Sequence, residues 1–286
     1  MHNVLTIQSA VAYGHAGNSS AVFPLMRLGV ETWPVYTVLF SNNTSYGAWR
    51  GPYVPPKDIA EVVKGVDERG ALEHCDAVLS GYQGDAATGA EILKAVELVK
   101  SRNPKAIYCC DPVIGDFGRG VYVVEGIPEY IRDHVVPAAD ILTPNHFELN
   151  LLTGIEATTL PEILEAVARL RAQGPSVVLV TSANVEGESQ ESVTMVAVSD
   201  EGAWQVTTPQ LRREFTGSGD VTTAIFLAHY LDTDVPTALS RTADSMYGIL
   251  KRTFEDDSRE LEIVAAQDEL VSPSQHFEVV DISSLL

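Results

Sequence analysis

The sequence predicts a single α/β domain with a central, mostly parallel sheet and helices on both faces. Short apolar runs alternate with longer segments of helical periodicity, the 286 residues suit one large domain, and no linker-like stretch divides them. Repeated β-α units place successive strands parallel in one sheet, because each helix returns the chain to the same edge. We therefore expect one domain over residues 1–286, with ligands beyond the carboxyl ends of its strands.

The expected elements follow this alternation along the chain. Apolar or alternating runs predict strands at 4–7, 30–38, 77–79, 106–110, 141–142, 177–180 and 277–282. Helical periodicity predicts helices at 19–28, 57–68, 86–101, 128–135, 146–152, 161–172, 220–231 and 236–253. Alternation around the turn Asp200-Glu201-Gly202 predicts a small antiparallel hairpin near 193–206. Residues 8–18 and 40–56 are expected to be loops.

Charge and cysteine content exclude several classes of function. The formal net charge is −20, with carboxylates spread along the chain, so we expect no nucleic-acid partner and no membrane partner. Cys75, Cys109 and Cys110 lack metal-ligand spacing, which favours reduced thiols in a cytoplasmic enzyme. No basic stretch followed by a long apolar run begins the sequence and no uncharged stretch reaches membrane-spanning length, so we expect neither a secretory signal nor a membrane anchor.

The most informative motif is Gly217-Ser218-Gly219-Asp220, which leads into the expected helix 220–231. Glycines allow close approach to the backbone, and the first N–H groups of a helix attract anions. A carboxylate among such donors suits a phosphoryl group in transit, with Asp220 taking a proton from the attacking hydroxyl. Taken alone, the motif favours an ordinary helix cap, because Gly-Asp commonly precedes helices, and the rest of the chain shifts the balance towards phosphoryl transfer.

Polar residues follow most of the expected strands. Ser9 follows the first strand, Asp111 follows 106–110, Glu148 comes shortly after 141–142, and Thr181-Ser182 follow 177–180. Each could simply form a turn or cap a helix. Together they place hydroxyls and Mg²⁺-binding carboxylates at the same rim as the glycine motif.

These motifs together resemble those of pyridoxal kinases in the ribokinase-like superfamily. The resemblance runs from about residue 3 to about residue 255, and the segment 264–268 also resembles bacterial members. It is carried by Ile7-Gln8-Ser9, residues 13–18, Phe40-Ser41-Asn42 with Thr44 and Tyr46-Gly47, Ser80-Gly81-Tyr82, Cys110-Asp111-Pro112-Val113, residues 143–148 and the glycine motif.

The resemblance implies phosphorylation of the 5′-hydroxymethyl group of pyridoxal by ATP. Asp220 would be the general base, and the backbone N–H groups of Gly217, Ser218 and Gly219 would form an anion hole. It also implies loops at 40–50 and 208–216 that fold over the substrates and exclude water. Relatives of this type imply a homodimer.

The resemblance also implies the remaining site residues. Ser9 would contact the pyridine ring, with Thr44, Ser45 and Tyr82 lining the vitamin pocket. Asp111 and Glu148 would lie by the phosphates and Mg²⁺, and Thr143 would help to hold a monovalent cation such as K⁺. The nucleotide would contact Thr181, Ser182, Thr208, Pro209, Gln210 and Leu211.

Two positions depart from some bacterial relatives, and three alternatives stay open. Ser45 stands where some carry Gln, and Thr181 stands where some carry Lys. Thr181-Ser182 resembles the hydroxyl pair of other pyridoxal kinases, so we expect hydroxyl contacts from these two residues. Hydroxymethylpyrimidine kinases share the fold and the glycine motif, but their Ser/Gly/Ala-rich turn is not found at 8–18. A kinase of broad specificity for the vitamin B6 forms is a second alternative. A non-catalytic nucleotide or vitamin carrier is a third, although a carrier has no use for Asp220 as a base.

Overall fold

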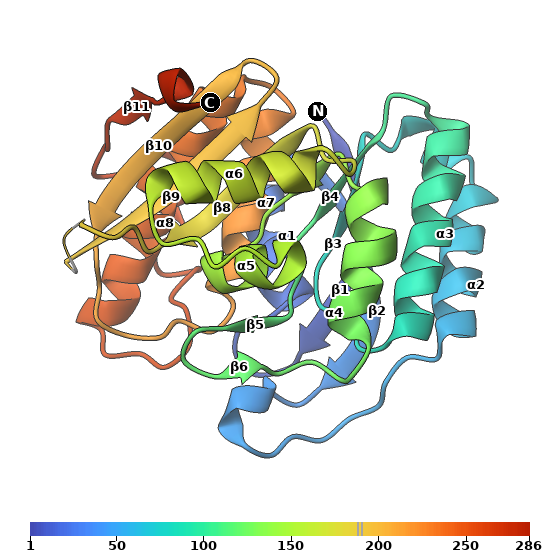
Figure 1. Ribbon diagram of the computed structural model, residues 1–286. Coiled ribbons are helices and arrows are strands. Elements are labelled where there is room, and N and C mark those ends of the chain that lie inside the picture. Colours follow the sequence, from blue (N-terminus) through green and yellow to red (C-terminus); the bar gives the residue numbers. More distant parts are fainter. Residues whose placement is uncertain (188, 190) are drawn as a thin grey trace.

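The sheet of the computed structural model, which describes residues 1–187, 189 and 191–286, runs through the middle of the molecule (Figure 1). Its strand order is β11-β10-β9-β8-β7-β4-β3-β1-β2. The strands are β1 (Asn3–Val11), β2 (Glu31–Phe40), β3 (Ala77–Ser80), β4 (Ile107–Cys110), β7 (Ile141–Leu142), β8 (Val177–Ala183), β9 (Ser192–Ser199), β10 (Gly202–Pro209) and β11 (Val279–Asp281). From β2 to β8 every neighbouring pair is parallel, which confirms the predicted fold class.

The predicted hairpin is present as β9 and β10, but it is not a separate unit. β9 pairs antiparallel with β8, and β10 pairs antiparallel with β11, so the hairpin extends the main sheet. A second, two-stranded ribbon of β5 (Gly115–Asp116) and β6 (Gly120–Val121) was not predicted. Strands of two residues are too short to show a hydrophobic period.

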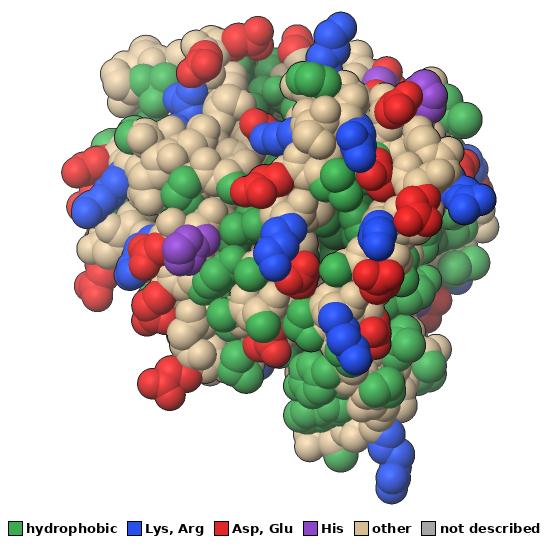
Figure 2. Space-filling view, turned by 90° about the vertical axis from the view of Figure 1, so that its right-hand side faces the viewer, with side chains coloured by type: hydrophobic (Ala, Val, Ile, Leu, Met, Phe, Trp, Pro, Cys, Tyr) green, Lys and Arg blue, Asp and Glu red, His purple; other side chains and the backbone are tan. Residues whose placement is uncertain are grey.

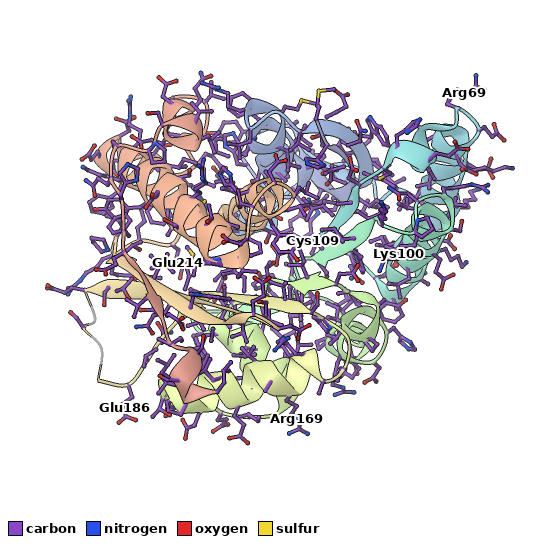
Figure 3. The ribbon with its side chains drawn as sticks, turned by 90° about the horizontal axis from the view of Figure 1, so that it is seen from above. Arg69, Lys100, Cys109, Arg169, Glu186 and Glu214 are labelled. Carbon is purple, nitrogen blue, oxygen red and sulfur yellow. The ribbon has the colours of Figure 1, made fainter. Side chains whose placement is uncertain are left out.

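Helices cover both faces of the sheet (Figures 1 and 3). One face carries α1 (Asn18–Arg27), α7 (Ser218–Tyr230), α8 (Val235–Glu255) and α9 (Asp268–Val271). The other carries α2 (Pro56–Asp67), α3 (Ala86–Arg102), α4 (Ile127–Tyr130), α5 (His146–Thr153) and α6 (Leu160–Arg171). Figure 3 shows Cys109 of β4 between the layers, whereas Arg169 of α6 lies at the outer surface.

Successive residues of each central strand pack into different cores. Val78 belongs to the core beneath α2 to α6, whereas Ala77 and Leu79 belong to the core beneath α1, α7 and α8. This alternation is the two-residue period of a strand buried on both faces. Residues 221–228 of α7 are all buried, because α7 lies between α1, α8 and the sheet. The glycine motif therefore begins a helix that is held on every side.

Two boundary differences affect the site. β1 was predicted to end at Ile7, but it continues to Val11, because its outer half still pairs with β2 beyond a register irregularity between Gln8 and Ala10. The segment 40–56, predicted as a loop, contains one 3-10 turn, η1 (Thr44–Tyr46). β2 tolerates Pro34 because it is the edge strand of the sheet.

Acidic and basic side chains are interspersed over the face that carries α2 and α3 (Figure 2). Hydrophobic side chains gather towards the bottom of that view, where Figure 1 places the segment after β2. Exposed apolar residues of β2 and of the segment after it are Tyr36, Leu39, Trp49 and Tyr53, and Val62 is exposed on α2. No helix within the described residues is both long and apolar enough to cross a membrane.

Candidate active site

One cavity of about 930 Å³ lies at the carboxyl ends of the parallel strands. It is lined by every residue predicted for catalysis or for binding substrate, nucleotide or metal: Ser9, Thr44, Ser45, Tyr82, Asp111, Thr143, Glu148, Thr181, Ser182, Thr208, Pro209, Gln210, Leu211, Gly217, Ser218, Gly219 and Asp220. Parallel strands that end at one rim bring these distant segments together. The structure therefore assembles the predicted set in one place, while the role of each residue stays a prediction.

The glycine motif forms the first turn of α7. Gly217 is the N-cap residue with φ 84°, and within the described residues no side chain caps the helix. A methyl group on Gly217 would collide with the His15 carbonyl oxygen, so only glycine fits. The Ser218 N–H donates to the Phe215 carbonyl oxygen over 3.3 Å, which leaves the N–H groups of Gly217 and Gly219 as the better placed anion donors.

Asp220 is not the helix cap that the motif alone allowed. Its Oδ2 accepts a hydrogen bond of 2.8 Å from the backbone N–H of Gly17, on a distant loop. A methyl group on Gly81 would lie 3.4 Å from Asp220 Oδ1, so the turn after β3 closes in from the other side. Burial raises the pKa of Asp220 to about 6, although the Gly17 hydrogen bond opposes the shift. A carboxylate with such a pKa can accept a proton near neutral pH.

Two further buried carboxylates, Asp111 and Glu148, line the cavity with Asp220. A methyl group on Gly219 would lie 3.3 Å from Asp111 Oδ2. Burial raises the pKa of Asp111 well above its ordinary value, and the negative charges of Glu148 and Asp220 raise it further. This concentration of like charge fits a cation, because a bound cation would offset the mutual repulsion. Within the described residues, no group of three or more metal-binding side chains is already arranged as a complete site.

Glu148 has a structural role as well as a predicted metal role. Its Oε1 accepts from the Ile114 N–H over 2.9 Å, and its Oε2 accepts from the Asn145 N–H over 2.9 Å. The Asn145 side chain in turn accepts from the Glu148 N–H, which completes a capping box at the start of α5. Burial raises the pKa of Glu148 to about 7. Because both oxygens already accept backbone N–H groups, contact with a metal through water suits Glu148 best.

Thr143 is buried and its hydroxyl is already hydrogen-bonded. Its Oγ1 lies 2.7 Å from Thr223 Oγ1 on α7 and donates to the Cys110 carbonyl oxygen over 3.4 Å. The hydroxyl therefore ties the end of β7 to α7. Its remaining lone pair could face a cation only in competition with these contacts.

Ser9 and the pair Thr181-Ser182 occupy irregular positions in their strands. The β1–β2 register shifts between Gln8 and Ala10, and the β8–β9 register shifts between Val180 and Ala183. In a regular strand Thr181 and Ser182 would face opposite sides, but here both line the cavity. Within the described residues the Ser9 hydroxyl has no hydrogen-bond partner, so it is free to meet a ligand.

The residues predicted to line the vitamin pocket differ in whether their hydroxyl groups are available to a ligand. The Ser45 hydroxyl donates to the Asn43 side chain, which also accepts from the Ser45 N–H over 3.1 Å, so Ser45 helps to close its own turn. The adjacent Thr44 side chain is exposed at the cavity. Burial raises the pKa of Tyr82, which keeps its hydroxyl protonated as a donor.

Sequence reasoning missed the contribution of the β5–β6 ribbon. Asp116, Phe117, Arg119 and Tyr122 all line the cavity. Arg119 donates to Asp116 over 2.8 Å from Nε and lies 4.6 Å from the centre of the Tyr122 ring. Aromatic and basic residues within the glycine-rich stretch 115–126 were the available signal. Glu214, labelled in Figure 3, also lines the cavity.

Comparisons with known proteins agree with this geometry. Residues 62–259 match the family model described as phosphomethylpyrimidine kinase. The chain is 51% identical over 279 residues to the pyridoxal kinase PdxY of Rubrobacter xylanophilus, across 97% of this chain and 96% of that protein. It is 51% identical over 277 residues to the pyridoxal kinase PdxY of Leifsonia xyli, across 96% of this chain and 98% of that protein.

Solved structures give the same result. The pyridoxal kinase of Leishmania donovani in complex with ADP and ginkgotoxin has a TM-score of 0.92 and 27% identity, across 99% of this chain and 100% of that chain. The same enzyme in complex with ADP and pyridoxine has a TM-score of 0.90 and 27% identity, across 98% and 99%. The resemblance drawn from the motifs is therefore confirmed: the chain belongs to the family described by the phosphomethylpyrimidine kinase model and, within it, to the pyridoxal kinase enzymes.

Proposed function

We propose that this kinase transfers the γ-phosphoryl group of ATP to the 5′-hydroxymethyl oxygen of pyridoxal, with Asp220 as the general base. The observation that carries the proposal is the position of Asp220. It lies at the glycine-lined start of α7, close to Asp111, and faces the cavity that Ser9 and Thr181 line at separate strand ends. An acceptor hydroxyl and a phosphoryl group can therefore meet beside one carboxylate.

The reaction follows from this arrangement. The acceptor oxygen forms a bond to the γ-phosphorus, the bond from that phosphorus to the β–γ bridging oxygen breaks, and ADP leaves. The proton of the attacking hydroxyl passes to Asp220, whose pKa of about 6 lets it accept this proton near neutral pH. The backbone N–H groups of Gly217 and Gly219, with Ser218 between them, stabilise the negative charge on the equatorial oxygens.

Asp111 and Glu148 would hold Mg²⁺ together with the ATP phosphates. Their mutual repulsion and burial disfavour two bare negative charges, which a divalent cation would offset. Bound Mg²⁺ supplies neutralisation of phosphate charge during transfer. Thr143 would assist a monovalent cation such as K⁺ on the same side of the cavity.

The two substrates would occupy opposite ends of the cavity. Ser9, Thr44, Ser45 and Tyr82 would contact the vitamin. The nucleotide would contact Thr181 and Ser182 on β8 and the end of β10, namely Thr208, Pro209, Gln210 and Leu211.

Assembly and location are also part of the proposal. The exposed apolar residues Tyr36, Leu39 and Tyr53, near edge strand β2, would be covered in a homodimer. Sedimentation at micromolar concentration, compared for the wild type and Leu39→Glu, tests this. A cytoplasmic location agrees with the three free, buried cysteines.

One assay tests the proposed activity against its alternatives. Purified protein is incubated with ATP, Mg²⁺ and, separately, pyridoxal, pyridoxine, pyridoxamine or hydroxymethylpyrimidine, and the phosphorylated products and ADP are measured. We expect pyridoxal-dependent formation of both products. Preference for hydroxymethylpyrimidine would support the first alternative, comparable turnover of the three vitamin forms would support the second, and binding without turnover would support a carrier.

A further inference from the structure

A short segment after α8, residues 258–262, contacts both loops at the acceptor end of the cavity. The first loop is residues 13–17 and the second is residues 43–47, which contains η1. The segment is fixed to the end of α8, because the Glu262 N–H donates to Thr253 Oγ1 over 2.9 Å. Thr253 is itself fully buried. The segment therefore forms a fixed support beside two surface loops.

The Glu260 carboxylate collects three donors from these loops. Its Oε2 accepts from the backbone N–H of His15 over 2.8 Å. Its Oε1 accepts from the Tyr46 hydroxyl over 2.7 Å and from Asn43 Nδ2 over 3.2 Å. Hydrogen bonds to an ionised carboxylate are stronger than those between neutral groups. One side chain thus connects two loops that are about thirty residues apart in sequence.

The neighbouring Arg259 holds the second loop from another direction. Its guanidinium lies 3.6 Å from the centre of the Tyr46 ring, and its Nη2 donates to the Ser45 carbonyl oxygen over 3.1 Å. Such stacking of a guanidinium on an aromatic face is attractive. Tyr46 is therefore held at its ring by Arg259 and at its hydroxyl by Glu260.

The first loop leads directly to the proposed base. The His15 carbonyl oxygen packs against Gly217, and the Gly17 N–H donates to Asp220 over 2.8 Å. A methyl group on Gly14 would collide with the Glu260 carboxylate, so the loop is closely seated on this side chain. A displacement of the loop at His15 would therefore also move Gly17, two residues further along the chain, and disturb the hydrogen bond from Gly17 to Asp220.

Glu260 itself is not among the described residues that line the cavity, whereas Gly17, Asn43 and Thr44 line it. Any effect of Glu260 on the substrate must therefore pass through the loops that it holds. Because Thr181, Ser182 and the end of β10 belong to other elements, this effect should be confined to the acceptor end.

We propose that Glu260 is a positioning residue that holds the 13–17 and 43–47 loops in the arrangement that binds the acceptor substrate. The inference rests on the proposed function for the identity of that acceptor, pyridoxal. Without Glu260 the loops would sample other arrangements, and binding would have to restore the competent one. The apparent affinity falls by the fraction of molecules that are competent.

The decisive variants are Glu260→Ala, Glu260→Gln and Tyr46→Phe. We expect Glu260→Ala to raise the pyridoxal KM on the order of 10-fold, while the ATP KM stays within about twofold. Glu260→Gln keeps one acceptor oxygen and should have a smaller effect. Tyr46→Phe removes one hydroxyl and, as a single variant, should raise the pyridoxal KM. Combined with Glu260→Ala it should raise that KM little further, because the two residues share one interaction.

Glu262→Gln is the matched control. Glu262 lies on the same segment and also contributes negative charge near His15, but its side chain makes no hydrogen bond within the described residues. It should leave both KM values unchanged. If Glu260→Ala and Tyr46→Phe fold normally and keep the wild-type pyridoxal KM, or if the ATP KM rises equally, the proposal is wrong.

A readout without substrate separates this proposal from the proposed function. In the ligand-free protein, amide hydrogen exchange at 14–17 and 43–47 should be faster in Glu260→Ala than in the wild type, and unchanged in Glu262→Gln. Unchanged exchange in Glu260→Ala would overturn the positioning role. A wild-type protein that fails to phosphorylate pyridoxal but shows this exchange pattern would instead overturn the function and leave the loop support in place.

Discussion

The backbone N–H of Gly17 donates to Asp220 Oδ2 over 2.8 Å and so joins the acceptor loop to the first turn of α7. The bond fixes one carboxylate oxygen, while Oδ1 lies towards the turn at Gly81. Because the bond favours the ionised carboxylate, it limits the rise in pKa that burial causes. The proposed base is thus oriented by a backbone N–H, a donor that every residue except proline carries.

Replacing Asp220 with Asn should abolish the base and preserve its shape. General-base catalysis is typically worth about 10²–10⁴-fold, so we expect kcat to fall by about that factor. The ATP dissociation constant, measured by calorimetry, should change little. Near-normal turnover in Asp220→Asn, with the chemical step shown to limit the rate, would remove Asp220 from its role.

The pH dependence of the wild type should follow the same carboxylate. Asp220 must be ionised to accept a proton, and burial raises its pKa to about 6 in the free protein. The kcat/KM for pyridoxal should therefore fall as the pH drops through about 6, by about tenfold per pH unit below it. A kcat/KM that stays level from pH 7 to pH 5 would contradict this assignment.

The contribution of Asp220 to folding stability should fall as the pH rises, whereas activity should increase. Because the folded pKa of Asp220 lies above its unfolded value, the folded protein binds this proton more tightly, and the associated stabilisation is lost as pH rises through the folded pKa. The neutral side chain of Asp220→Asn avoids that loss. We therefore expect the variant to melt at a higher temperature than the wild type at pH 8, with the difference shrinking towards pH 4. Equal differences at both pH values would contradict the shift.

Metal dependence should identify the role of Glu148. Glu148→Gln retains one oxygen for the Ile114 or Asn145 N–H but lacks the negative charge, so a higher Mg²⁺ concentration should be needed for half-maximal activity. Glu162→Gln is the control, because Glu162 completes the equivalent capping box of α6 and does not line the cavity within the described residues. It should lower the melting temperature and leave the Mg²⁺ requirement unchanged. An unchanged Mg²⁺ requirement in Glu148→Gln would exclude Glu148 from the metal site.

The sequence was sufficient for the parallel part of the sheet and for placing the predicted site residues at one rim, but not for the residues that the β5–β6 ribbon adds to the cavity. Parallel strands place their carboxyl ends at one edge, so Asp111 and Thr181 could be brought together without coordinates. The sequence could not show which of these side chains already hydrogen-bond to other groups of the protein. The resemblance assigned Thr143 to a cation and Ser45 to the vitamin pocket, yet both hydroxyls are hydrogen-bonded to neighbouring side chains. Such partners depend on the distance between elements, which periodicity does not contain.

Residues of irregular segments were the other omission. Glu260 and Arg119 belong to segments with weak or very short secondary structure, where no hydrophobic period marks a position as special. The irregularity of β1 at Ser9 was missed for a similar reason. The strand continues because it pairs with β2, which is a tertiary contact rather than a local preference.

Ser9 provides the sharpest test of acceptor recognition. Its side chain faces the cavity and, within the described residues, has no hydrogen-bond partner. If its hydroxyl meets the pyridine nitrogen, Ser9→Ala leaves that nitrogen unpaired, which costs about 1–3 kcal/mol. The pyridoxal KM should then rise on the order of 10-fold, since about 1.4 kcal/mol is tenfold, while the ATP KM stays unchanged.

The matched control is Ser19→Ala, and its expected outcome is the reverse. The Ser19 hydroxyl accepts from the Val11 N–H over 3.0 Å and donates to the Val11 carbonyl oxygen over 2.8 Å, so it supports the end of β1 without lining the cavity. Ser19→Ala should lower the melting temperature by a few degrees, whereas Ser9→Ala should not, because no bond within the described protein is lost. Melting curves and pyridoxal kinetics on both variants separate the two roles. A Ser9→Ala enzyme that is destabilised but keeps its pyridoxal KM would show that Ser9 supports the strand rather than the substrate, and the acceptor would then be recognised from the 43–47 loop and Tyr82 alone.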